Sequence, residues 1–280
     1  MTAAVDADVV DADVVVVGAG IIGLAAAREV QRRRGGHVLV LDKAHGVAAH
    51  QTGRNSGVVH SGLYYRPGSA KATLVAAGRA RLERYCDERG LPYDRCGKVV
   101  VATSADEVHA LGELERRGAA NGVEVRRIGP SQLHELEPHV AGLAALSVPS
   151  TAITDYRAVA SSLADDLVAD GGELRTGVEV LGVQASARGE VVVAHVGGEV
   201  RARWLLNCAG LHSDRVAAMA GADTGVTIVP FRGEYHELVP SARHLVRHLV
   251  YPVPDPRWPF LGVHMTRMVD GSVHVGPNAV

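Results

Sequence analysis

The sequence predicts a mixed α/β fold, α+β overall, that begins with a nucleotide-binding type of strand, helix and strand. Three observations predict it. Residues 14–17 are four consecutive valines, which is typical of a strand buried on both faces. A glycine cluster follows at residues 18–23, where a turn must lead into a helix. HVLVLD at residues 37–42 predicts a second buried strand, so the first 42 residues form a complete βαβ unit.

The remaining elements follow in order from hydrophobic spacing, capping residues and turn residues. We expect helices at about 22–33, 70–90, 104–121, 130–138 and 155–170, and one that starts near 213. We expect strands at 98–103, 123–128, 174–183, 190–196 and 199–206. From residue 226 the chain is strand-like and rich in proline, with an irregular loop at YPVPDPRWP.

Composition excludes several classes of protein. The chain has 280 residues, 47% of them hydrophobic, which suffices for one large domain or two interlocked ones. A net charge of -2 argues against a nucleic-acid partner. Three cysteines without a Cys/His cluster suggest neither disulfides nor a metal, and favour a cytoplasmic, reducing compartment. The acidic N-terminus is no signal peptide, and the apolar run 14–27 is too short to span a bilayer, so membrane contact would be peripheral.

The glycine cluster has the spacing of a dinucleotide-binding fingerprint. Gly18 would permit the tight turn, Gly20 the approach of a pyrophosphate, and Gly23 close packing of the helix on the sheet. The helix N-terminus would offer N–H groups to the phosphates. Asp42 ends the second strand 19 residues after Gly23, where it can bind ribose hydroxyls and disfavours NADP. These residues leave NAD and FAD open, and the alternative is a glycine-rich turn in an unrelated α/β protein.

A wider set of motifs narrows the choice. The segments are HQTGRNSGVVHSGLYYRPGS from residue 50, CGKVVVAT, EPHVAGL, DYRAVA, NCAGLHSD, VPFRGEYHEL and the C-terminal stretch from YPVPDPRWP to GPNAV. With the N-terminal fingerprint, they resemble the FAD-dependent oxidoreductases of the D-amino-acid oxidase superfamily, and more narrowly the L-2-hydroxyglutarate oxidase/dehydrogenase family. The resemblance runs from about residue 14 to the end of the chain.

The resemblance implies two domains, each built from separated segments. A Rossmann-like FAD-binding domain would take residues 1–85 and 150–220, and an interleaved mixed-sheet substrate domain would take 86–149 and 221–280. Family members usually continue well past the equivalent of GPNAV, so we expect the chain to be C-terminally truncated. Arg54 stands where the family more often has His, which keeps a cation but removes a titratable group.

The resemblance also assigns residues to the cofactor. The small polar side chains of 52, 55 and 56 suit donors to the pyrophosphate or the flavin carbonyls, and the backbone of residue 178 would clamp adenine. The alternative is that these polar residues satisfy their own backbone. The full expected set is Gly18, Gly20, Ile22, Gly23, Asp42, Lys43, Thr52, Arg54, Asn55, Ser56, Val178, Cys208 and Gly210.

Oxidation of a 2-hydroxy acid needs a base for the hydroxyl proton, and His60 is the candidate because it lies in the flavin-adjacent passage. Alternatively His60 only hydrogen-bonds the flavin or a carbonyl. Two substrate carboxylates suit the arginines Arg232 and Arg267, although a surface ion pair is the alternative for each. Further substrate donors would be Tyr65, Tyr235 and His264.

Three functions therefore compete. The first is FAD-dependent oxidation of L-2-hydroxyglutarate to 2-oxoglutarate, with electrons passed to a quinone-type acceptor or O2. The second is the same fold acting on a secondary amine or glycerol 3-phosphate, against which the FRGEY and HMTR segments speak. The third is an inactive fragment that binds nucleotide weakly.

Overall fold

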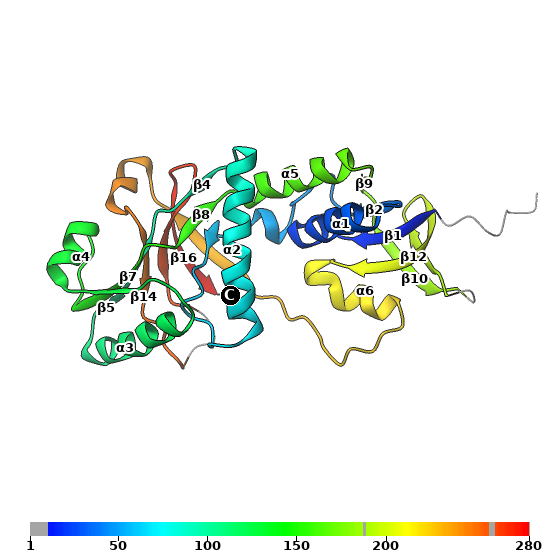
Figure 1. Ribbon diagram of the computed structural model, residues 1–280. Coiled ribbons are helices and arrows are strands. Elements are labelled where there is room, and N and C mark those ends of the chain that lie inside the picture. The colour runs from blue at the N-terminus through cyan, green and yellow to red at the C-terminus, as the bar shows by residue number, and fades with distance from the viewer. Residues whose placement is uncertain (1–10, 187–188, 258–260, 280) are drawn as a thin grey trace, which may run out of the picture. The chain divides into compact units, whose positions relative to one another are not determined.

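The computed structural model describes residues 11–186, 189–257 and 261–279, and these form two compact units (Figure 1). The first unit takes the described residues up to Asn55 together with Tyr156–Pro230. The second takes Ser56–Asp155 and the described residues from Phe231 onward. These junctions do not coincide with the expected domain boundaries near residues 85, 150 and 220, because helix α2 (Ala70–Arg89) contacts strand β4 (Tyr93–Asp94) of the second unit.

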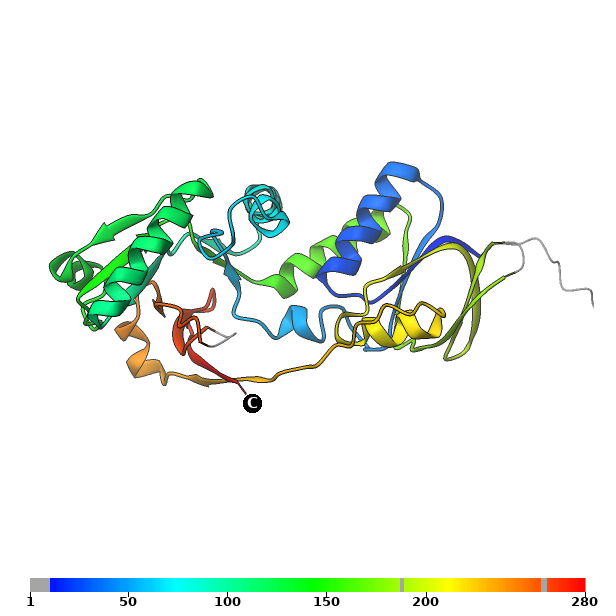
Figure 2. The same ribbon diagram turned by 90° about the horizontal axis from the view of Figure 1, so that it is seen from below.

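The first unit is a six-stranded sheet with the order β10-β11-β12-β1-β2-β9. β1 pairs in parallel with β2 and β12, and β2 in parallel with β9, while β10, β11 and β12 form an antiparallel meander. Helices α1 and α5 pack on each other, and α6 contacts β10 and β12 (Figure 2). The elements are β1 (Ala12–Val17), α1 (Ile21–Arg34), β2 (Val38–Asp42), η1 (Gln51–Gly53), α5 (Tyr156–Ala169), β9 (Glu173–Thr176), β10 (Val180–Ala185), β11 (Val191–His195), β12 (Gly198–Asn207), η2 (Gly210–His212) and α6 (Ser213–Met219).

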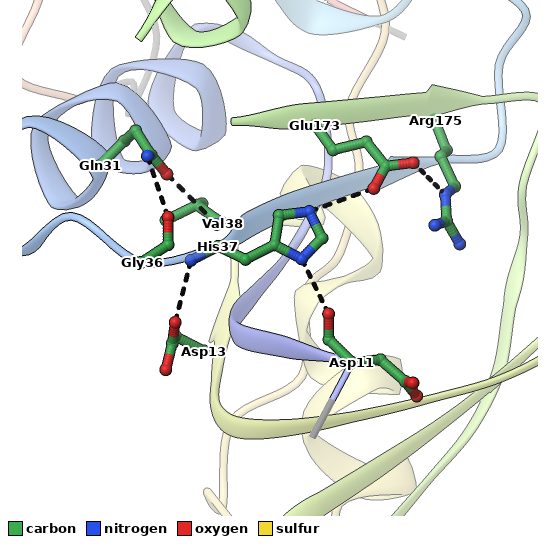
Figure 3. Close-up of polar contacts among 8 residues, drawn as sticks. All are labelled: Asp11, Asp13, Gln31, Gly36, His37, Val38, Glu173 and Arg175. Atoms are coloured by element: carbon green, nitrogen blue, oxygen red, sulfur yellow. Dashed lines mark hydrogen bonds and ion pairs between the residues drawn. The ribbon is translucent and has the colours of Figure 1, made fainter. Parts of the chain in front are cut away.

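A polar network fixes the amino ends of β1, β2 and β9 (Figure 3). The His37 ring lies between the Asp11 carbonyl, 2.7 Å from Nδ1, and the Glu173 carboxylate, 3.1 Å from Nε2. The His37 backbone N–H donates to Asp13 at 2.9 Å. Buried Gln31 of α1 donates to the Gly36 carbonyl and accepts from the Val38 N–H, so the turn into β2 is held from both sides. The polar anchoring of these three strands is thus opposite the end that carries the glycine turn.

The second unit contains a seven-stranded sheet, β13-β16-β15-β14-β5-β7-β6, and a three-stranded sheet, β3-β8-β4. In the larger sheet β14 and β5 are parallel and the other pairs are antiparallel. Besides α2 and β4, the elements are β3 (Val58–Val59), β5 (Lys98–Ala102), α3 (Ala105–Ala120), β6 (Arg126–Ile128), α4 (Pro130–Leu136), β7 (Ala144–Val148), β8 (Ala152–Thr154), β13 (Gly233–Glu237), η3 (Pro240–Leu245), β14 (Leu249–Pro252), β15 (His264–Arg267) and β16 (Val273–Ala279).

Strand β5 separates two hydrophobic clusters of this unit. Val100 and Ala102 pack with α3 and with Leu249 and Tyr251 of β14, whereas Val99 packs on the opposite face with α4. This is the period of two expected of a strand, and burial on both faces explains the unbroken run of valines. Lys98 is in register with Leu249 of β14, and the same period places it on the α3 face.

Candidate functional site

Two glycines of the fingerprint are required by close backbone contacts. Gly18 has φ +111°, and a Cβ there would lie 2.3 Å from the carbonyl oxygen of Cys208. A Cβ on Gly23 would lie 1.9 Å from the Gly18 carbonyl oxygen. Both distances are far below any real Cβ contact, so only glycine lets β1, α1 and the end of β12 meet. Gly23 therefore acts in packing, as the spacing predicts.

Asp42 holds the glycine turn in place. Its Oδ2 accepts from the Ala19 N–H at 2.7 Å and its Oδ1 from the Ala44 N–H at 2.8 Å. The half-buried carboxylate ties the end of β2 to the turn after β1. Asp42 also lines the pocket described next, and a carboxylate has further lone pairs to offer. Asp42 can therefore hold the turn and also accept hydrogen bonds from ribose hydroxyls.

A pocket of about 910 Å³ opens at the carboxyl ends of β1, β2 and β12. Ligands of doubly wound α/β sheets bind at this edge. The expected cofactor residues that line it are Gly18, Gly20, Ile22, Asp42, Lys43, Thr52, Arg54, Val178, Cys208 and Gly210. Residues that line it but were not expected include His50, Gln51, His212 and Arg215.

The lining of this pocket holds more basic than acidic side chains, the acidic ones being Asp42 and Glu179. Lys43 Nζ lies 3.1 Å from His212 Nε2, and the rings of His50 and His212 are 6.4 Å apart. Burial and the charges of Lys43 and Arg215 lower the pKa of His212 below its usual value. Arg54 adds a further exposed cation. An anionic ligand is what these charges favour.

The polar passage after β2 is partly used by the protein itself. Thr52 Oγ1 accepts from the Ile21 N–H at 3.0 Å, which occupies one free donor at the start of α1. Asn55 donates from Nδ2 to the carbonyl oxygens of Thr52 at 2.6 Å and Gln51 at 3.3 Å. The pocket lining does not include Asn55, Ser56 or Gly23, and Ser56 belongs to the second unit. For Asn55 the structure shows the alternative interpretation, a polar turn residue that satisfies its own backbone.

Two of the predicted cofactor residues that line the pocket, Val178 and Cys208, use their backbone N–H groups within the protein. The Val178 N–H donates to the Asp42 carbonyl at 2.8 Å, and the Cys208 N–H to the Val17 carbonyl at 2.9 Å. Burial raises the pKa of the Cys208 thiol, so this cysteine stays protonated at neutral pH. It behaves as a small partly buried residue rather than a redox thiol.

A second polar cluster lies in the second unit, on the α3 face of the large sheet. His264 of β15 stacks on Tyr251 of β14, with ring centroids 4.1 Å apart. Lys98 Nζ lies 4.3 Å from the ring centroid of Tyr64 and 5.0 Å from that of Tyr251. His60 follows β3 directly and is close enough for the charges of Lys98 and His264 to act on it.

These surroundings set the protonation states of the cluster. Burial, then the charges of Lys98 and His264, lower the pKa of His60 to about 4. Burial also lowers the pKa of His264, and raises that of Tyr251 to about 12. At neutral pH His60 is therefore a neutral imidazole able to accept a proton, as the expected base must be.

The other predicted substrate residues meet only in part. Tyr235 lies against His264, with ring centroids 6.4 Å apart. Arg232 forms an ion pair with Glu234 at 2.5 Å with its side chain 73% exposed, and Arg267 pairs with Asp94 at 3.2 Å. For both arginines the structure thus shows the ion pair that was the alternative interpretation. Half-buried Tyr65 is held by its backbone, since its carbonyl accepts from Asn121 at 2.8 Å.

Comparison with known proteins identifies the family. The family model described as "FAD dependent oxidoreductase" matches residues 13–280. The chain belongs to this FAD-dependent oxidoreductase family. Among curated relatives, the L-2-hydroxyglutarate dehydrogenase of Escherichia coli (strain K12) is 45% identical over 96% of this chain and 64% of its own length. The mitochondrial L-2-hydroxyglutarate dehydrogenase of Homo sapiens is 43% identical over 96% of this chain and 61% of its own length.

Solved structures agree with this assignment. An L-alpha-glycerophosphate oxidase from Mycoplasma pneumoniae with FAD bound has a TM-score of 0.87 and 25% identity, covering 96% of this chain and 71% of that one. A glycine oxidase from Geobacillus kaustophilus, at 20% identity and a TM-score of 0.83, shares the fold. The predictions of the family, of the α/β flavoprotein fold and of FAD as the family's cofactor are confirmed. The chain spans 64% of the length of the Escherichia coli relative. Within the described residues, no helix is long and apolar enough to cross a membrane.

Proposed function

We propose that this chain is part of an enzyme that uses FAD to oxidise L-2-hydroxyglutarate to 2-oxoglutarate. The observation that carries the proposal is 45% identity, over 96% of the chain, to a protein named L-2-hydroxyglutarate dehydrogenase. The described sites supply what the reaction needs, an anion-binding nucleotide pocket in the first unit and a neutral imidazole in the second.

The residues of the first unit fit the cofactor. Gly18 permits the tight turn, Gly20 at the start of α1 lets the backbone approach a pyrophosphate, and the N-terminus of the 14-residue helix α1 favours its negative charge. Lys43, Arg54 and Arg215 add positive charge to the pocket wall, and Asp42 faces the ribose position. When bound there, FAD supplies the two-electron acceptor for the hydride that leaves C2.

The residues of the second unit handle the substrate in this proposal. The C2 hydroxyl loses its proton as the C2–H bond gives up a hydride, so the product gains a C=O bond and charge balances. His60 takes the proton, because its imidazole is neutral above a pKa of about 4. Tyr235 orients the substrate as a hydrogen-bond donor, whereas neutral His264 directs its Nδ1–H to the Gly262 carbonyl at 2.9 Å and can only accept through Nε2. The electrons pass to a quinone-type acceptor or O2, with at most peripheral membrane contact.

The test is a spectrum of the purified chain before and after anaerobic addition of L-2-hydroxyglutarate. We expect a flavin spectrum that bleaches with this substrate and not with glycerol 3-phosphate or a secondary amine. Bleaching with another substrate alone would replace the substrate assignment. A chain that stays colourless after incubation with FAD would support the inactive fragment instead.

A glycine variant shows whether the flavin uses the described pocket. Gly18→Ala places a Cβ 2.3 Å from the Cys208 carbonyl and should abolish FAD binding. Gly46→Ala is the matched control, because no atom lies within 4 Å of its added Cβ. Equal flavin content in the two variants would contradict binding at this turn.

A further inference from the structure

The second unit contains a buried lysine that the proposed reaction does not use. Lys98 is 1% exposed, and its Nζ has no hydrogen-bond partner among the described residues. The hydroxyl of Tyr64, whose ring lies 4.3 Å from this Nζ, is also buried without a partner among those residues. Buried polar groups are normally paired, and an unpaired buried ammonium is among the most costly groups to hold in a protein. Two buried, unpaired donors side by side indicate a site in which a bound ligand accepts their hydrogen bonds.

Packing does not require a lysine at this position. Lys98 lies on the α3 face of β5, where the following residues, Val100 and Ala102, are apolar and buried. A methionine of similar length would fill the same space without a charge to desolvate. The ammonium group must therefore serve another purpose than filling the core.

The neighbours of Lys98 are aromatic or basic. Tyr64 comes from the segment after β3 and Tyr251 from β14, and both rings face the ammonium. The charge of Lys98 acts on His60 and on His264 of β15, in each case lowering the pKa of the imidazole. Beyond these, Tyr235 of β13 and Cys96 act on Tyr251. No Asp or Glu side chain is among the groups that shift the pKa of Lys98, His60 or His264. Among the described residues, these basic groups therefore have no carboxylate counter-ion acting on them.

We propose that Lys98, with Tyr64 and His60 beside it, forms a site that binds a carboxylate group of a small anionic ligand. Lys98 is the counter-ion, and Tyr64 is a neutral hydrogen-bond donor beside it. His60 and Tyr64 are half-buried, whereas Lys98 and His264 are buried. The identity of the ligand as a 2-hydroxy dicarboxylate rests on the proposed function, whereas the carboxylate site itself does not. Carboxylate binding then comes from this lysine rather than from Arg232 or Arg267, which are both in ion pairs.

The site should depend on pH in a defined direction. Burial lowers the pKa of Lys98 to about 7, so the free protein loses this charge as the pH rises through that value. An anion favours the charged lysine, and its affinity therefore falls above pH 7. His60 adds no opposing change there, because it is already neutral.

The test compares the parent chain with Lys98→Met, and with Lys71→Met as a control at an exposed lysine. Binding of glutarate is measured by calorimetry, and the melting temperature is measured with and without glutarate. We expect Lys98→Met to weaken glutarate binding by about tenfold or more, as for loss of a charge-assisted hydrogen bond. Without ligand, Lys98→Met should melt at a higher temperature than the parent, because it no longer buries an unpaired charge. Lys71→Met should match the parent in both measurements.

The opposite results overturn the site. If the parent binds no carboxylate, or if Lys98→Met keeps the parent's affinity for glutarate, Lys98 is not a carboxylate anchor. Should Lys98→Met fail to fold, the parent alone decides: glutarate binding must weaken at least severalfold between pH 6.5 and 8.5, and unchanged affinity refutes the site.

Failure of the proposed function looks different from failure of this site. If glutarate binds in a Lys98-dependent way but L-2-hydroxyglutarate does not bleach the flavin, the carboxylate site holds and the substrate assignment is wrong. If L-2-hydroxyglutarate bleaches the flavin of Lys98→Met at the same rate and with the same concentration dependence as in the parent, the substrate assignment holds and the proposed Lys98 site is wrong.

Discussion

At the scale of single residues, His60 shows how burial and then neighbouring charges set a protonation state. Its pKa of about 4 arises from burial first and from Lys98 and His264 next. An isolated histidine, with a pKa of about 6.5, is the stronger base but is partly charged at pH 6.5. The cluster thus keeps His60 in its neutral form throughout the physiological range.

This protonation state can be measured directly. NMR titration of the His60 ring should show no transition near pH 6.5, and Lys98→Met should move its pKa upward, toward the value of an isolated histidine. Because the pKa is lowered on folding, the unfolded chain binds the extra proton first, so His60 makes stability fall as pH drops from 6.5 towards 4. A His60 transition at pH 6.5 in the parent would contradict the arrangement.

At the scale of elements, a buried carboxylate joins helix α4 to strand β14. Glu137 follows α4 directly and is 0% exposed. Its carboxylate accepts from the backbone N–H groups of Arg247, at 3.1 Å, and His248, and lies 2.8 Å from His248 Nδ1. The residues just before β14 are thereby fixed, and with them the register of Tyr251 beside His264.

We predict that Glu137→Gln lowers the free energy of unfolding by about 1–3 kcal/mol, because an amide replaces one acceptor oxygen with a donor and leaves a buried N–H donor unpaired. Urea unfolding of the variant measures this loss. Glu135→Gln on the exposed side of α4 is the control and should fall within about 0.5 kcal/mol of the parent. Equal midpoints for the two variants would show that the Glu137 carboxylate is not needed.

Long periodic elements could be predicted from the sequence, and short ones could not. The expected helix at 104–121 is α3 (Ala105–Ala120), which begins with a capping box between Ser104 and Glu107. Strand β6 is shorter than expected at its start, because the Val123 N–H bonds to Gly118 and continues the α3 turn. Strands β7 and β8 were missed, since stretches of three to five small or mixed residues carry too little alternation to recognise. The loop at YPVPDPRWP lies partly outside the described residues, at 258–260.

The two sites differ in how far the sequence could predict them. The pocket at the carboxyl ends of β1, β2 and β12 follows from local spacing, since Gly18 and Asp42 lie within one βαβ unit. Lys98 depends on which face of β5 is covered, which tertiary packing decides. A signal was nevertheless present, because period two from the buried Val100 places Lys98 on the same face. The ion pair of Arg232 with Glu234 also had a local signal, because the two residues are only two apart in the sequence.

At the scale of the molecule, binding chemistry is divided between the two units. The first unit anchors the amino ends of β1, β2 and β9 through His37 and leaves their carboxyl ends to the pocket (Figure 3). The second unit gathers His60, Lys98 and His264 on the α3 face of its large sheet. Both chain segments of each unit contribute, so neither site is complete in one stretch of sequence.

This division predicts two separate patterns of ligand protection in hydrogen exchange. FAD should slow exchange in the first unit, at the turn after β1, the start of α1 and the end of β12, where the pocket lies. Glutarate should slow exchange in the second unit, in β5, β14 and β15, which carry Lys98, Tyr251 and His264. A ligand at 100 times its Kd stabilises the bound form by about 2.7 kcal/mol. Amides that exchange only after the ligand has dissociated should therefore exchange roughly hundredfold more slowly. Gly18→Ala should remove the first pattern and keep the second, and Lys98→Met should do the reverse. Loss of both patterns in either variant would mean that the two sites cannot be assigned to separate units.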